Sequence, residues 1–286
     1  MKFAIFLKNC GDNMSADQEI KVYILDLGKL ECDENWMVAM STSGNKHHKN
    51  VLSHWIEIPV YAVLIDHPDG KMIFDLGCHP QANEGYWCEG LVNTFPFTFT
   101  ENQRLEHQLA LLNISPEDIS TVILSHMHLD HIGNIHLFKH ADVYVSRKEF
   151  EYAQTIVHAS PDPNKHGAYV KADIEVPVKQ YHLIDDDTEL FAGIEFISLT
   201  GHTAGLFGLV IHLKNEGVLI FPMDAIYNQT VFGPPAKAAG LIYDSIAFFK
   251  SIEKVRQLAK KYNAQVMFPH DMEMFEKMKK APDYYC

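Results

Sequence analysis

The stretch T-V-I-L-S-H-M-H-L-D-H, residues 121–131, joins a short apolar run to a cluster of residue types that bind metals. His126 and His128 are two positions apart, so on an extended strand end both side chains point to one side and reach one cation. Asp130 and His131 lie on the turn beyond, where they can serve a second cation. Imidazole nitrogen and carboxylate oxygen suit Zn²⁺ and its neighbours Fe, Mn and Co. The alternative interpretation, a solvated turn with three histidines, is disfavoured by the apolar strand that precedes it.

Four local ligands are too few for two cations, so further ligands must come from elsewhere in the chain. Three other candidates each end an apolar strand: His202 in L-T-G-H-T-A-G, Asp224 in I-F-P-M-D and His270 in M-F-P-H-D. A single histidine after a strand is more often structural. Together, however, the three complete a set of five histidines and two aspartates, and this set predicts a centre for two metals.

Composition narrows the classes of function. The chain has 286 residues, with 37 acidic against 24 basic side chains, which gives a net charge of −13. Because binding to phosphates needs clustered Lys and Arg, this balance argues against nucleic acid and against an anionic membrane surface. No run approaches the roughly 18 apolar residues of a membrane helix, and the short apolar start does not fit a secretory signal. We therefore expect a cytoplasmic protein.

Short apolar runs bounded by Gly, Asp and Pro predict buried strands over residues 21–28, 35–40, 60–67, 71–77, 121–125, 142–146, 195–200, 206–213, 217–223 and 265–269. Helical periodicity predicts helices over 101–112, 147–157 and 245–262. Strands mixed with helices in both halves predict an α/β (α+β) fold of two sheets flanked by helices. We expect one domain over 1–286, with an N-terminal extension over 1–20 and loops or insertions over 80–105 and 158–175.

The two halves of the chain repeat one pattern. Residues 72–75 (M-I-F-D) and 219–224 (L-I-F-P-M-D) each end an apolar strand on Asp. Residues 121–126 and 265–270 each end one on His. If these are corresponding strands, their polar ends meet in one place, which is where sites form in such folds.

These motifs resemble the metallo-β-lactamase superfamily, whose members share a four-layer αβ/βα fold with two mixed β-sheets. The H-x-H-x-D-H motif carries the resemblance together with the three downstream ligand candidates. Within the superfamily the chain is similar to the N-acyl-homoserine lactonases, through D-L-G-C-H-P (75–80), Tyr227 three residues after Asp224, and F-P-H-D (268–271). The similarity runs from about residue 21 to the end of the chain.

The resemblance implies a role for each candidate residue. One metal is expected on His126, His128 and His202 and the other on Asp130, His131 and His270, with the Asp224 carboxylate bridging both. Two Zn²⁺ ions per chain are implied, with Fe, Mn or Co as alternatives, and a shared ionised water attacks the lactone of an N-acyl homoserine lactone, a quorum-quenching reaction. Tyr227 is expected to stabilise the oxyanion and Asp130 to carry a proton to the leaving alkoxide. Asp75 is expected to support the ligands through hydrogen bonds.

The residues that line the substrate pocket are less clear from the sequence. Candidates for the wall of an acyl-chain pocket lie in an expected early strand: Trp36, Met37 and Met40. A second group alternates along a Pro-containing segment that is either an apolar lid or subunit contact, or an edge strand in the core: Phe95, Phe97 and Phe99. The expected partner is a small lactone with an acyl chain, and the protein is a monomer or a homodimer.

Other hydrolases on the same scaffold are the alternatives: a glyoxalase II-like thioesterase, a β-lactamase or a phosphodiesterase. The C-terminal tail offers only Lys279 and Lys280 to an anionic glutathione, and the net charge of −13 disfavours nucleases. A redox diiron protein or a metal-dependent binder is a different class. The complete histidine set and the lack of a flavin-binding extension disfavour it.

Overall fold

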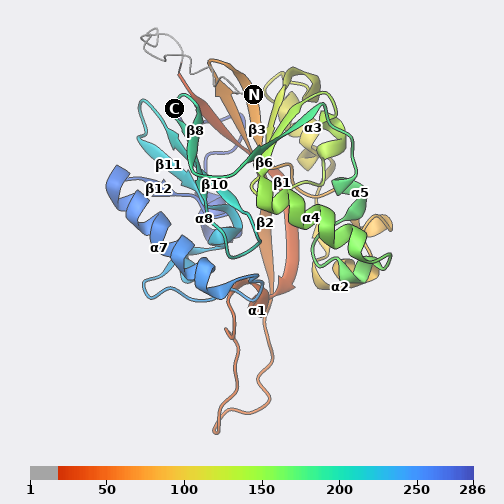
Figure 1. The fold of residues 1–286 in the computed structure, drawn as a ribbon. Helices are drawn as coiled ribbons and strands as arrows, with labels where there is room; N and C mark the ends of the chain where they lie inside the picture. The colour runs from red at the N-terminus through yellow and green to blue at the C-terminus, as the bar shows by residue number, and fades with distance from the viewer. Residues whose placement is uncertain (1–18) are drawn as a thin grey trace, which may run out of the picture.

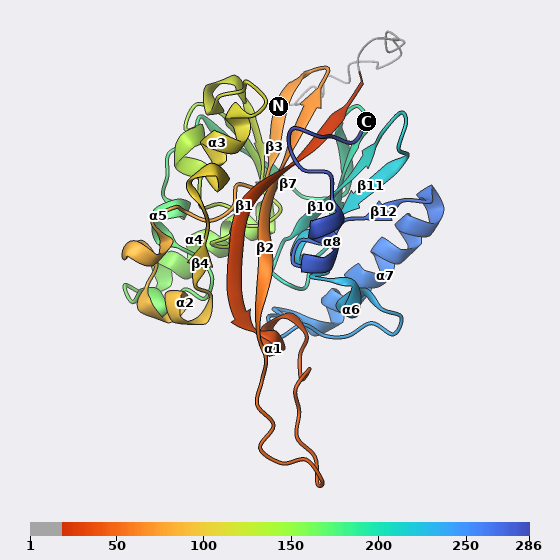
Figure 2. The ribbon, with the colours of Figure 1, turned by 180° about the vertical axis from the view of Figure 1, so that it is seen from behind.

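Two β-sheets pack face to face, and helices cover their outer sides (Figure 1). The view from behind in Figure 2 shows the same order of layers, with α7 outside one sheet and α3 to α5 outside the other. The computed structural model describes residues 19–286, so the extension expected over 1–20 lies almost wholly outside the described residues. The observed layers are those of the predicted four-layer αβ/βα architecture.

The larger sheet has seven strands in the order β4-β1-β2-β3-β5-β6-β7. Strands β1, β2 and β3 are antiparallel neighbours, whereas β3, β5, β6 and β7 run parallel. Its strands are β1 (Lys21–Asp33), β2 (Trp55–His67), β3 (Gly70–Phe74), β4 (Phe97–Thr98), β5 (Thr121–Ile123), β6 (Asp142–Ser146) and β7 (Gln180–Ile184).

The smaller sheet has five strands in the order β12-β11-β10-β9-β8. They are β8 (Thr188–Phe191), β9 (Ile194–Ser198), β10 (Phe207–His212), β11 (Val218–Phe221) and β12 (Gln265–Val266). The α-helices are α1 (Glu34–Met37), α2 (Glu89–Thr94), α3 (Leu105–Ala110), α4 (Arg147–Ala159), α5 (Lys171–Ile174), α6 (Gln229–Phe232), α7 (Ser245–Tyr262) and α8 (Met272–Lys277). In the described part of the chain, no helix combines the length and the apolar composition needed to cross a bilayer.

Strands β1 and β2 are buried on both faces because they lie between two layers. In β1, Val22 and Ile24 belong to the core between the sheets, which includes Phe207 of the second sheet. Leu25 and Leu27 belong to the other core, which lies under the helices. This alternation follows from the two-residue period of a strand, and it explains why residues 22–25 of β1 (V-Y-I-L) form a continuous apolar run.

Most predicted elements form near their expected bounds, and α7 begins and ends at the predicted residues. The strand predicted over 35–40 is wrong, because residues Glu34–Met37 form helix α1. Asp33 caps this helix by accepting a hydrogen bond from the Asn35 N–H at 2.9 Å. Residues 80–105, expected as loops, contain α2 and β4, and residues 158–175 contain α5. Strands β7 and β8 were not predicted, because their sequences carry polar residues on both faces.

The pattern repeated in the two halves corresponds to a parallel pair of strands that occurs once in each sheet. Strand β3 pairs with β5 in parallel, with Met72 opposite Thr121, and β11 pairs with β12 in parallel, with Leu219 opposite Gln265. Parallel neighbours end at the same edge of a sheet. The polar residues that follow these four strands are therefore brought to one region.

Candidate metal centre

The loop that follows β5 is held against the segment that follows β3. The Leu76 N–H donates to the His131 carbonyl at 2.8 Å, and the Gly133 N–H donates to the Gly77 carbonyl at 2.8 Å. A Cβ at Gly133 would lie only 2.2 Å from the His79 nitrogen, so this close approach requires glycine. The loop geometry is thus fixed by backbone contacts from outside the loop.

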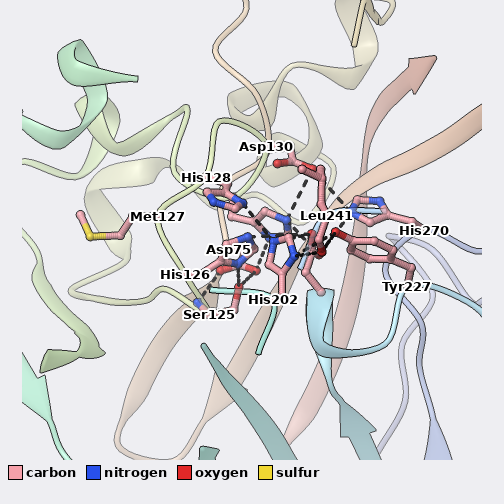
Figure 3. Close-up of polar contacts among 12 residues, drawn as sticks. Asp75, Ser125, His126, Met127, His128, Asp130, His202, Tyr227, Leu241 and His270 are labelled. Atoms are coloured by element: carbon pink, nitrogen blue, oxygen red, sulfur yellow. Dashed lines mark hydrogen bonds and ion pairs between the residues drawn. The ribbon is translucent and has the colours of Figure 1, made fainter. Parts of the chain in front are cut away.

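The seven predicted ligand residues come together in the structure (Figure 3). They form two groups, and within each group the ligand atoms lie within 4.8 Å of one another: His126, His128 and His202 in the first, and Asp130, His131, Asp224 and His270 in the second. His202 follows β9, Asp224 follows β11 and His270 follows β12. Both sheets therefore contribute to one centre.

The Asp224 carboxylate lies between the two groups, with one oxygen toward each. Its Oδ2 is 3.4 Å from Nε2 of His202 and 3.9 Å from Nε2 of His126. Its Oδ1 is 3.2 Å from Nε2 of both His131 and His270. This is the placement expected of a bridging carboxylate.

The donor atoms of the centre are suited to divalent metals because several of them lack hydrogen-bond partners within the protein. Nε2 of His126, Nε2 of His131 and Oδ1 of Asp224 are buried without any hydrogen-bond partner. Buried polar atoms normally have a partner, and these three point into the space between the two groups. Imidazole and carboxylate donors without competing hydrogen bonds are what Zn²⁺ and similar ions require.

The electrostatics of the two groups differ. Burial lowers the pKa of His126, His128 and His202, so these imidazoles stay neutral and keep a lone pair for a cation. Burial also opposes the charged form of His131 and His270, but nearby carboxylates, chiefly those of Asp130 and Asp224, outweigh it and raise the pKa of both histidines. The second group is thus the more negative of the two.

Asp75 lies beneath the ligands and belongs to neither group. Its carboxylate accepts hydrogen bonds from the Ser125 N–H at 2.7 Å, from the Ser125 hydroxyl at 2.6 Å and from Nδ1 of His131 at 2.7 Å. Ser125 Oγ lies 3.0 Å from Nδ1 of His126. Because Nδ1 of each histidine is engaged in this way, Nε2 is the atom presented to a cation. The contacts are those expected of a supporting carboxylate.

Tyr227 is buried beside the centre, with its ring centroid 5.5 Å from those of His202 and His270. Its hydroxyl lies 2.9 Å from Nδ1 of His202. Nε2 of His202 faces Asp224, so Nδ1 carries the hydrogen and donates it to the tyrosine oxygen. The hydroxyl hydrogen of Tyr227 is then donated to the Leu241 carbonyl at 3.5 Å, a long contact that a better-placed acceptor can replace.

A mainly apolar pocket opens over the ligands. Of the predicted pocket residues, Met37 and Phe95 line it, together with five residues that the sequence did not indicate: Leu30, Ile58, Leu129, Ala168 and Leu241. These five come from β1, β2 and three loops, so no local pattern joins them. Trp36 is not among the lining residues and packs on Phe95, with ring centroids 5.9 Å apart.

The remaining pocket candidates lie elsewhere. Met40 is 76% exposed beyond α1 and does not line the pocket. Phe97 is in the edge strand β4, which pairs with β1, and it is buried in the core. Phe99 stacks on Phe97 with ring centroids 5.0 Å apart. The aromatic segment is therefore an edge strand rather than a lid.

Residues 55–221 match the metallo-beta-lactamase superfamily. The chain therefore belongs to the metallo-beta-lactamase superfamily, and within it to the family of the N-acyl homoserine lactonases. N-acyl homoserine lactonase AiiB of Agrobacterium fabrum is 34% identical, over 92% of this chain and 98% of the relative. The AiiB protein of Rhizobium rhizogenes is 33% identical over the same shares. The predicted family is confirmed.

Solved structures show the same fold. An N-acyl homoserine lactone hydrolase with N-hexanoyl-L-homoserine at its catalytic metal centre superposes with a TM-score of 0.78 and 25% identity, covering 93% of this chain and 98% of that one. A variant of B. thuringiensis AiiA with N-decanoyl-L-homoserine at its active site gives the same values. The predicted fold class is confirmed.

Proposed function

We propose that the protein hydrolyses the lactone ring of N-acyl homoserine lactones and so inactivates quorum-sensing signals. The observation that carries this proposal is a two-part ligand set with a tyrosine hydroxyl beside it, beneath an apolar pocket. The relatives support it, because both AiiB proteins are named N-acyl homoserine lactonases and cover nearly the whole chain. An apolar pocket suits the acyl chain of such a substrate.

The proposed cofactor is a pair of Zn²⁺ ions, with Fe, Mn or Co suited to the same donors. His126, His128 and His202 would hold one ion, and Asp130, His131 and His270 the other, with Asp224 shared. Asp130 and Asp224 lie close together, and burial raises the pKa of each, but the neighbouring His131 and His270 outweigh it and lower both. Among the described residues no Lys or Arg is buried beside them, so in the loaded site bound cations would balance the charge that protonated His131 and His270 otherwise balance. Bound divalent cations ionise a water near neutral pH and polarise an ester carbonyl.

The side chains of the protein supply the remaining chemistry. Burial, together with the charges of Asp224 and Asp130, raises the pKa of Tyr227 well above its usual value, so the phenol stays neutral. Its hydrogen, which in the structure makes only a 3.5 Å contact with the Leu241 carbonyl, is donated to the substrate carbonyl oxygen as negative charge develops there. We propose that Asp130, whose side chain is 11% exposed, takes the proton of the attacking water. It passes that proton to the ring oxygen as the ring C–O bond breaks, which leaves an alcohol and a carboxylic acid.

The proposal is tested by proton release in a pH-stat. Opening of a lactone at neutral pH yields a carboxylic acid that ionises, so each turnover releases one proton. Metal-loaded protein is given homoserine lactones of several acyl lengths, and nitrocefin and a thioester are offered separately. We expect proton release with the lactones and none from protein stripped of metal. Turnover of nitrocefin or the thioester without turnover of any lactone would overturn the lactonase assignment in favour of another hydrolase of this fold.

The cytoplasmic location expected from the sequence remains a prediction. Fractionation of cells that express the tagged chain checks it.

A further inference from the structure

Glu149 lies in the first turn of α4 and is completely buried. The sequence S-R-K-E over residues 146–149 has the pattern of a capping box, in which the glutamate would accept a hydrogen bond from the backbone of Ser146. The structure shows no side-chain cap at this helix end. Instead, the carboxylate turns inward, toward the loops that carry the first ligand group.

The carboxylate of Glu149 contacts the loop that carries His126 and His128. Its Oε1 accepts a hydrogen bond from the Met127 N–H at 3.1 Å, between His126 and His128 in the chain. It also accepts one from the Tyr169 hydroxyl at 2.9 Å, and the Tyr169 ring packs edge-on against His128, with centroids 4.6 Å apart.

The same carboxylate faces the loop that carries His202. Burial raises the pKa of Glu149, and the Thr203 hydroxyl and the Gly205 N–H act to lower it. A Cβ at Gly205 would lie 2.4 Å from the Glu149 nitrogen, so this loop is pressed against the start of α4. The carboxylate therefore accepts a hydrogen bond from the loop of His126 and His128, and the first turn of its helix packs against the loop that carries His202.

We infer that Glu149 is a positioning residue that holds His126, His128 and His202 in place for one of the two metals. This inference rests on the proposed two-metal function. Asp75 is the counterpart chiefly for the second group, because it binds Nδ1 of His131 directly and reaches His126 only through Ser125. Removing one supporting carboxylate should therefore weaken one metal more than the other.

The experiment measures metal content by elemental analysis, zinc affinity by competition with a chelator, and the absorption of Co²⁺ added stepwise. We expect two ions in the wild type. Glu149→Ala should keep one ion and bind the other about 10- to 100-fold more weakly. Glu149→Gln should stay closer to the wild type, because its amide oxygen can still accept from Met127 and Tyr169. Asp75→Asn is the matched control. It should lose the Co²⁺ absorption band of the other ion, not the band that Glu149→Ala loses.

Tyr169→Phe removes one contact of Glu149 and keeps the ring, so it tests the inference even if Glu149→Ala does not fold. We expect a smaller loss of affinity at the same site. Wild-type affinity at both sites in Glu149→Ala, or equal weakening of both, would overturn the role of Glu149. A wild-type protein without bound metal would instead overturn the proposed function.

Discussion

Replacing Tyr227 with Phe removes one hydroxyl from the proposed site and leaves the ring in place. The ring stays packed between His202 and His270, so no cavity opens. His202 keeps a partner for Nδ1, since the Leu241 carbonyl lies 3.3 Å away. The lost hydrogen bond should lower the free energy of unfolding by about 1 kcal/mol, and the metal content should not change.

The effect on catalysis should be much larger. Loss of one donor to a developing oxyanion typically lowers kcat by about 100- to 1,000-fold, or about 2.7–4 kcal/mol. We expect the lower end, about 100-fold, because bound cations would share the charge on the same oxygen. KM should change little, because the hydroxyl interacts mainly with the transition state.

Steady-state kinetics with one homoserine lactone, together with elemental analysis, provide the assay. Tyr61→Phe is the matched control, because Tyr61 is also buried and its hydroxyl donates only to the Phe268 carbonyl, at 3.3 Å. It should keep a near-normal kcat. If Tyr227→Phe lost metal in proportion to activity, Tyr227 would be structural. If its kcat were normal, the oxyanion role would be refuted.

Three further predictions concern metal, pH and the pocket. Removing metal with a chelator should lower Tm by on the order of 10 °C, because ligand binding stabilises the folded state, and added Zn²⁺ should restore it; an unchanged Tm by calorimetry would count against bound metal. Burial raises the pKa of Asp173 to about 7 despite its hydrogen bond from Tyr86 at 2.6 Å. Because the folded pKa is raised, the stability contributed by Asp173 is complete below pH 4 and is lost as pH rises to about 7. Asp173→Asn should therefore flatten the fall in Tm over that range, and an unchanged slope in a thermal-shift series would contradict this. Met37→Trp should fill the pocket mouth and lower kcat/KM for long acyl chains by more than 10-fold while sparing short ones; equal losses across chain lengths would argue against an acyl pocket at Met37.

Sequence was sufficient for features that depend on local pattern. The apolar run before His126, the spacing of the loop ligands and the strand-end positions of Asp224 and His270 predicted which residues meet. The amphipathic pattern of α7 gave its bounds. Local pattern failed at residues 35–40, where the cap supplied by Asp33 makes a helix of residues that read as a strand.

Tertiary structure alone decided how these residues act together. In the folded chain the two oxygens of Asp224 lie toward different groups. Glu149 accepts a hydrogen bond from the Met127 N–H instead of capping its helix. Leu30, Ile58 and Leu241 come together to line the pocket. The physical reason is that ligand type and strand register are encoded within a few neighbouring residues. Distances between side chains on separate strands and loops arise only when the two sheets pack and exclude water.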